Sequence, residues 1–337
     1  MMPDAVAALA RLGVRIGAVD SFPFRGIRFI DCGASVAADF PSGPGRGVRR
    51  TTLHRILVEH AEAAGVIMRW GAHPDLDTLR YGWLIGADGE GSFVRKWAGL
   101  DEFARDRRRF GFRRHYRIEP WSAHMELYWG NGYQVYVTPV SPDSVCVAAI
   151  SHDSQFRLDD AVARMPELAR RLDGAEILTA ERGAVTSSRK LKAVYRDRVA
   201  LVGDASGSVD AVTGEGLCLA FRQAAALARA IERGDLAEYQ REHRRIARRP
   251  EWMARTLLTL GEHAPLRRAA MLGLSAQPRI FAKLLALHVG AYENNDSHAS
   301  DSDAGPVCAG DRAPSRSGSD PSPVHAGRYS SHGARLV

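Results

Sequence analysis

Two acidic turns that follow short apolar runs have the clearest potential for chemistry in this sequence. Asp204 comes shortly after Val199-Ala200-Leu201-Val202, whose length and β-branched content predict a buried strand. Asp88 comes shortly after Leu84-Ile85-Gly86, which we interpret as the end of another buried strand. Open α/β sheets bind ligands at the carboxyl ends of their strands. A carboxylate placed there can accept hydrogen bonds from the hydroxyl groups of a bound molecule.

The residues that follow Asp204 predict a helix with a bare first turn. From Gly214 onward the apolar residues take helical spacing, at Leu217, Ala220, Phe221, Ala224, Leu227, Ala228 and Ile231. Gly214 and Gly216 leave the backbone uncovered where this helix begins. The free N–H groups and positive dipole end of a helix start suit an anion or an electron-rich ring edge.

The residues that follow Asp88 predict a second turn and helix. Ala87, Asp88 and Gly89 read as a turn, and Ser92 is a plausible N-cap for a helix that continues to Trp97. Strand, acidic turn and helix therefore occur twice in the same order.

Together, the two segments resemble the flavin-binding motifs of FAD-dependent oxidoreductases of the aromatic-hydroxylase and geranylgeranyl-reductase type. Gly203, Asp204 and residues 214–217 match the second flavin motif, and residues 86–95 match the pattern GADGxxSxVR at every fixed place. Members often carry a proline before the second glycine pair, where this chain has Ala211 and Val212.

The resemblance implies a role for each motif residue. Asp204 is expected to bind the ribityl chain, and the helix start at Gly214, Gly216 and Leu217 to face the pyrimidine edge of the isoalloxazine ring. Asp88 and Gly89 are expected to contact the pyrophosphate region and, in hydroxylases, to help hold NAD(P)H. Arg95 is expected to pair with Asp88 or to close its helix. Arg50, three places before Leu53 at the start of a predicted helix, is expected to contact the dinucleotide or flavin.

The segment between the two motifs predicts an antiparallel sheet. Residues 125–129 and 133–137 flank the hairpin turn Gly130-Asn131-Gly132. In the family that the chain resembles, this sheet roofs a substrate cavity. The candidate wall residues are Tyr128, Trp129, Tyr136 and Thr138, and a purely structural role for them is an equally good interpretation.

The family begins with a strand, a GxGxxG turn and a helix, and no segment here fits that context. The glycine cluster at residues 41–47 follows no strand-like run. The expected fold class is therefore α/β, an FAD/NAD(P)-binding Rossmann-like domain lacking its first βαβ unit, with an inserted antiparallel β-sheet substrate domain and C-terminal helices. We expect the chain as given to bind FAD poorly and to bind it well once an upstream unit is restored.

The expected domain limits follow from these motifs and from the composition. Residues 1–104 form the first part of the FAD-binding domain, 105–185 the substrate sheet, and 186–250 the second part of the FAD-binding domain. Residues 251–290 form a helical cap, preceded by a helix that ends before Pro250. Residues 291–337 are rich in Ser, Asp, Gly, Pro and Ala, which predicts a disordered tail.

The overall composition narrows the class of protein. The formal charge of +7 is concentrated in residues 105–114 and 241–249, which we interpret as solvated faces rather than a nucleic-acid site. The four cysteines lack metal or disulfide spacing, which indicates a cytoplasmic protein without a metal site. No apolar run is long enough to span a bilayer, although the cap helices could rest on a membrane surface.

No set of acid, base or nucleophile stands out, so the catalytic residues are unknown at this stage. The resemblance implies an FAD-dependent oxidoreductase whose flavin is reduced by NAD(P)H. The favoured function is a monooxygenase acting on a hydrophobic small molecule. The alternatives are a flavin-dependent reductase of a lipid double bond, similar to geranylgeranyl reductases, and a truncated product that binds no FAD.

Overall fold

The computed structural model describes residues 1–289, and the tail predicted over residues 291–337 lies outside them. A small sheet of three strands has the order β12-β13-β5 and carries both acidic turns. These strands are β5 (Leu84–Gly86), β12 (Tyr195–Arg196) and β13 (Val199–Leu201). Strands β13 and β5 are parallel, with Leu201 opposite Gly86, so the chain leaves both strands at the same edge of the sheet.

A larger sheet of nine strands has the order β14-β11-β6-β9-β8-β7-β2-β3, with β10 paired to β6. Its strands are β2 (Gly26–Asp31), β3 (Ala34–Asp39), β6 (Phe103–Arg117), β7 (His124–Trp129), β8 (Tyr133–Ser141), β9 (Ser144–Ser151), β10 (Glu176–Ile177), β11 (Arg182–Leu191) and β14 (Gly207–Ser208). The pairing is antiparallel except between β2 and β7. The sheet takes in β2, β3 and β14 from outside the expected range 105–185. A separate two-stranded ribbon joins β1 (Phe22–Phe24) to β4 (Gly45–Gly47).

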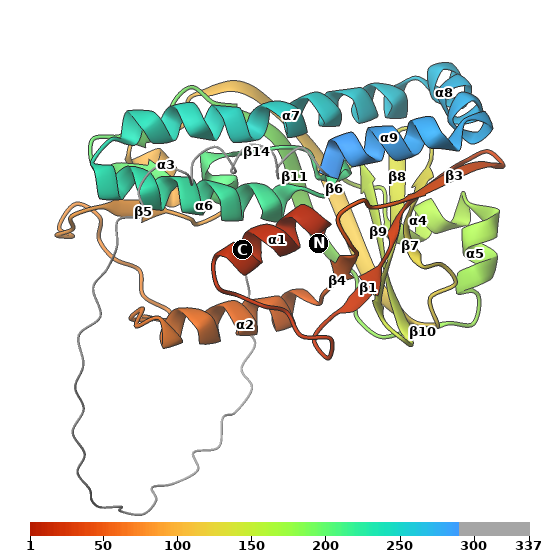
Figure 1. Cartoon of the computed structure of the whole chain (residues 1–337), viewed down its shortest axis with the longest axis horizontal. Coiled ribbons are helices and arrows are strands. Elements are labelled where there is room, and N and C mark those ends of the chain that lie inside the picture. The colour runs from red at the N-terminus through yellow and green to blue at the C-terminus, as the bar shows by residue number, and fades with distance from the viewer. Residues whose placement is uncertain (290–337) are drawn as a thin grey trace, which may run out of the picture. The chain divides into compact units, whose positions relative to one another are not determined.

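Helices cover both faces of the large sheet (Figure 1). Helices α4 (Leu158–Ala163) and α5 (Pro166–Leu172) pack on one face through Leu158 and Leu168. The two helices are separated before Pro166, which disfavours helical geometry at the preceding residue. Helices α8 (Ala264–Ala276) and α9 (Pro278–Val289) pack against β2 and β3.

The small sheet is covered by the two long helices α6 (Gly216–Arg233) and α7 (Leu236–Glu262). The expectation that the second of these ends before Pro250 is wrong, because α7 runs through that proline to Glu262. Buried Ile246 and Ala254 anchor the helix on either side of Pro250, and this packing offsets the lost backbone hydrogen bond. The short helices α1 (Pro3–Arg11) and α3 (Phe93–Trp97) and the longer α2 (Arg50–Ala63) complete the described helices near the small sheet (Figure 1).

A buried ion pair connects the large sheet to the loop that leads into α6. Arg109 Nη1 on β6 donates to Asp210 Oδ1 over 2.8 Å, and both side chains are 2% exposed. Arg109 Nη2 also donates to Gln134 Oε1 and, over 3.1 Å, to the carbonyl oxygen of Ile150. Asp210 Oδ1 accepts the backbone N–H of Val212 as well. The loop is therefore fixed to the sheet by a charge that has no access to water.

Breaking this pair on one side should destabilise the protein strongly. We expect Arg109→Met to lower the free energy of unfolding by about 3–5 kcal/mol, because it leaves the Asp210 charge buried without a partner. The double change Arg109→Met/Asp210→Asn should recover part of this loss. Urea unfolding of the three proteins measures both effects.

The matched control is Arg117→Met on the same strand, whose guanidinium is 53% exposed and pairs with Asp143 and Glu176. Exposed pairs contribute about 0–1 kcal/mol. Equal losses in Arg109→Met and Arg117→Met would contradict the assigned importance of the buried pair.

Candidate functional site

The turn after β13 holds Asp204 in place from behind. Gly203 has φ +63°, a left-handed conformation that favours glycine, and its N–H donates to Gln223 Oε1 over 2.9 Å. Ser206 Oγ donates to the Gly203 carbonyl over 2.8 Å and lies 2.8 Å from His243 Nε2. Burial, aided by Lys190 and Arg244, lowers the pKa of His243 to about 4, so its ring is neutral at physiological pH. The polar groups behind the turn are thus paired with one another.

The Asp204 residue itself is exposed. Within residues 1–289, no group forms a hydrogen bond with its carboxylate, which reaches solvent. Partial burial by the surrounding protein raises the pKa of Asp204 overall, although the nearby Arg50 guanidinium acts in the opposite direction. The structure therefore brings Arg50, at the start of α2, close enough to Asp204 to interact electrostatically. The two residues were predicted as site residues from separate motifs.

The backbone at the start of α6 is bare, as the glycine pattern predicts. Gly214 adopts φ +68° and ends a short 3₁₀ turn (η2, Ala211–Thr213), and α6 begins at Gly216. A Cβ added at Gly216 would meet no atom within 4 Å, so this position is open. Leu217 turns inward and packs against the cluster of Leu9 and Leu53 that joins α1 and α2 to α6.

The first motif uses Asp88 to start α3. Its Oδ2 accepts the N–H groups of Phe93 over 2.6 Å and Val94 over 3.1 Å, and its Oδ1 accepts Ser92 Oγ over 2.6 Å. Burial alone would raise the pKa of Asp88, but these hydrogen bonds lower it overall. Ser92 Oγ caps the helix by accepting the N–H of Arg95, as predicted. Gly89 follows Asp88 with φ +78° in the turn.

Arg95 joins the two motifs instead of pairing with Asp88, which corrects the first of its two expected roles. Its guanidinium is 1% exposed; Nε donates to Asp101 Oδ1 over 2.7 Å, and Nη2 donates to the Glu90 carbonyl over 2.7 Å. Nη1 donates to the carbonyl of Ala205, over 3.0 Å, in the turn that carries Asp204. Because α3 has Asp88 as its cap acceptor, the carboxylate is not available to Arg95. One buried cation therefore fixes the first turn against the second.

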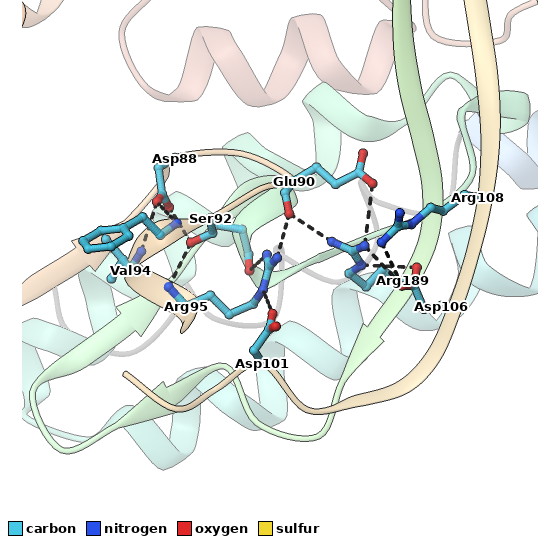
Figure 2. Close-up of polar contacts among 11 residues, drawn as sticks. Asp88, Glu90, Ser92, Val94, Arg95, Asp101, Asp106, Arg108 and Arg189 are labelled. Atoms are coloured by element: carbon cyan, nitrogen blue, oxygen red, sulfur yellow. Dashed lines mark hydrogen bonds and ion pairs between the residues drawn. The ribbon is translucent and has the colours of Figure 1, made fainter. Parts of the chain in front are cut away.

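A second arginine, which sequence reasoning missed, reaches the same carbonyl from the large sheet (Figure 2). Arg189 on β11 donates to the Glu90 carbonyl through Nη1 over 2.9 Å and to Asp106 through Nε over 3.3 Å and Nη2 over 3.2 Å. Its guanidinium and that of Arg95 both lie over the ring of Phe103. Asp106 and Arg189 are cross-strand partners, and that register is the only signal that could have indicated their contact.

The sheet separates the four candidate substrate residues. Trp129 is buried and packs edge-on against Phe29, and half-buried Tyr136 and Thr138 share its face of the sheet. Tyr136 Oη donates over 3.3 Å to the Val212 carbonyl in the loop before α6. Tyr128 lies on the opposite face, where it packs with α4 and α5 and donates to Glu126 Oε2 over 2.8 Å. Tyr128 therefore cannot line the same wall as the other three, because successive side chains alternate across a strand.

Glu215, between the two glycines of the second motif, is a further buried group that sequence reasoning did not single out. Its Oε2 lies 3.9 Å from His288 Nδ1 on α9. Burial and the neighbouring Asp4 raise the pKa of Glu215 to about 8, against the opposing influence of Arg249 and Arg222. Burial lowers the pKa of His288 to about 4. A protonated Glu215 beside a neutral His288 is therefore the stable arrangement near neutral pH.

Two further observations apply to residues 1–289. No helix there is both long and apolar enough to cross a bilayer. Nor do three His, Cys, Asp or Glu side chains gather closely enough in this part of the chain to hold a metal ion.

Comparison with solved structures identifies the architecture. A flavoprotein/dehydrogenase from Cytophaga hutchinsonii is 17% identical, with 88% of this chain and 84% of that chain covered and a TM-score of 0.69. HpxO from Klebsiella pneumoniae, in complex with FAD and uric acid, is 20% identical, with 86% of each chain covered and a TM-score of 0.67. The chain has the same fold as these flavoproteins. The expected fold class is thus confirmed in outline.

Another similar structure is the flavin-dependent halogenase CmlS, which is 18% identical with a TM-score of 0.59. The match covers 77% of this chain but spans only 55% of CmlS. No protein-family profile matches the sequence, and no curated relative does. Because the identities are low, these similarities establish the fold, while the activity rests on the residues of the site.

The raised pKa of Glu215 predicts a specific pH dependence. The folded protein holds the Glu215 proton up to about pH 8, whereas the unfolded chain releases it near pH 4.5. Stability conferred on the wild type by this proton is therefore lost as the pH rises between these values. We expect Glu215→Gln, which stays neutral, to gain stability relative to the wild type between pH 5 and 9 by more than about 1.4 kcal/mol, the equivalent of one pKa unit.

Thermal and urea unfolding across that pH range measure the difference. Glu232→Gln, an exposed position on the same helix, is the control and should track the wild type. A constant difference between Glu215→Gln and the wild type from pH 5 to 9 would refute the buried, protonated state of Glu215.

Proposed function

We propose that this chain is an FAD-dependent oxidoreductase, and that Asp204, Arg50 and the start of α6 hold the ribityl and pyrimidine portion of the flavin. The observation that carries the proposal is the contrast within one turn. The polar groups behind Asp204 are paired with one another, whereas within residues 1–289 no hydrogen bond reaches its carboxylate and the position of Gly216 is open. A fold shared with FAD-dependent enzymes supports this assignment.

The available groups fit the flavin chemically. The Asp204 carboxylate can accept hydrogen bonds from sugar-alcohol hydroxyls, and charge-assisted bonds of this kind are the stronger ones. The N–H groups at the start of α6 can donate to carbonyl oxygens of the ring. Arg50 supplies positive charge beside Asp204 for a phosphate or for the ring edge. When bound, FAD supplies the redox chemistry, and the protein supplies orientation and electrostatics.

The favoured reaction is a monooxygenation of a hydrophobic small molecule, with NAD(P)H as the reductant. Tyr136, Thr138 and Trp129 share one face of the sheet, and Tyr136 contacts the loop before α6 directly. A substrate that rests on this face would lie close to the flavin edge. Tyr128 is not proposed as a substrate residue, because it lies on the other face.

One observation favours the alternative of a reductase acting on a lipid double bond. Helices α8 and α9 expose large apolar side chains at Leu266, Leu272, Ile280, Leu284 and Leu287. Arg279 and Lys283 lie among them in the sequence of α9. Such a surface suits peripheral contact with an anionic membrane, from which a lipid substrate would be drawn.

Removing the Asp204 carboxylate should weaken flavin binding. We expect Asp204→Ala to raise the Kd for FAD by about 10- to 150-fold, which corresponds to a loss of 1.5–3 kcal/mol of charge-assisted hydrogen bonding. Quenching of flavin fluorescence measures the Kd. The titration uses the 337-residue chain.

Asp143→Ala is the control, since this carboxylate lies in the exposed turn between β8 and β9. It should leave the Kd unchanged. Equal FAD affinity with and without the Asp204 carboxylate would show that this residue has another role. A chain that binds no FAD at all would overturn the proposed function.

A further inference from the structure

A groove lined by arginine and lysine runs between the large sheet and α7. It has a volume of about 230 Å³. Its cations are Arg105 and Arg107 on β6, Arg189 and Lys190 on β11, and Arg255 on α7. We call it the basic groove.

Acidic residues neutralise only part of the basic groove. Glu251 on α7 lies 3.0 Å from Lys190 Nζ and 3.6 Å from Arg255 Nη2, so two cations share one carboxylate. Within residues 1–289, no carboxylate forms an ion pair with Arg105 or Arg107. The other carboxylate of the lining, Glu262, lies 3.9 Å from His152 Nε2. The groove therefore carries an excess of positive charge at its sheet side.

The strand register places like charges side by side in the groove, where the Glu251 carboxylate pairs with only one of them. Arg105 is the direct cross-strand partner of Lys190, and Arg107 lies opposite Ser188 on the same face. Like charges placed directly opposite each other on neighbouring strands are destabilising. An anion bound between the two strands would offset this repulsion. A purely structural role for the cations does not explain why like charges are placed opposite each other.

The size and lining of the basic groove limit what it can hold. Val209, Ala254 and Leu258 supply an apolar strip beside the cations. Pockets for drug-sized ligands usually measure about 300–1,000 Å³. The groove is smaller and suits a phosphate or diphosphate group with a short apolar segment rather than a whole dinucleotide. Guanidinium groups bind phosphate oxygens in a bidentate manner, which favours this class of anion.

We propose that the basic groove binds the phosphate or diphosphate end of an organic ligand. Val209 lines the groove and directly precedes Asp210, which Arg109 fixes in the loop before α6. A ligand anchored in the groove by its phosphate would thus lie beside the loop that leads to the proposed flavin site. The inference concerns a separate set of residues and does not require that flavin binds.

Isothermal titration with inorganic pyrophosphate, in the absence of FAD, tests the proposal. We expect the wild type to bind pyrophosphate and Arg105→Gln/Arg107→Gln to bind it at least 10-fold more weakly. The matched control Arg69→Gln/Arg170→Gln removes the same charge from two exposed positions outside the groove and should bind like the wild type. A urea unfolding curve for each variant confirms that it is folded.

Two further titrations identify the source of the phosphate. ADP represents a soluble nucleotide, and farnesyl diphosphate represents a lipid-like diphosphate with an apolar chain. If ADP or farnesyl diphosphate binds to the wild type and this binding is lost in Arg105→Gln/Arg107→Gln, the result supports the proposed phosphate site and assigns the ligand class. Absence of pyrophosphate binding to the wild type, or an equal loss in the control variant, would overturn the proposal, and neither result would bear on FAD binding.

Discussion

The arrangement of both acidic turns depends on the buried guanidinium of Arg95. A charge removed from water costs several kcal/mol unless it is paired and its donors are satisfied. Arg95 meets this requirement only when Asp101, the Glu90 carbonyl and the Ala205 carbonyl are all within reach. Because these acceptors come from different segments, the turn after β5 and the turn after β13 must be in place together. Because burying the guanidinium without these partners costs free energy, Arg95 constrains the relative positions of the two turns.

Other buried polar groups extend this constraint toward the large sheet. Arg189 donates hydrogen bonds to both the Glu90 carbonyl and Asp106, and Arg109 pairs with Asp210 in the loop before α6. This framework leaves the outward side of the site open: no hydrogen bond reaches the Asp204 carboxylate within residues 1–289, and a Cβ at Gly216 would meet no atom within 4 Å. The polar groups behind the turn are buried and paired, whereas the acceptor and donors in front of it face solvent. This arrangement is expected of a binding site whose ligand supplies the missing hydrogen bonds.

Local signals in the sequence predicted the parts of this site that depend on local structure. The apolar run before Asp204, the cap at Ser92 and the glycines before α6 each define an element within a few residues, and the structure contains all three. Contacts between distant segments were not accessible, because Arg189 meets Glu90 across 99 positions and Arg109 meets Asp210 across 101. The face of Tyr128 and the continuation of α7 through Pro250 depend likewise on packing partners that no local pattern specifies.

Native-state hydrogen exchange of Arg95→Met tests the central claim most directly, since it reports the opening of each turn separately. If Arg95 joins the turns, the amides of residues 88–92 and those of residues 203–207 should lose protection together and by similar factors. Lys96→Met, at the adjacent exposed position of α3, should leave both turns unchanged. Loss of protection confined to α3 and residues 88–92, with residues 203–207 as protected as in the wild type, would contradict the account.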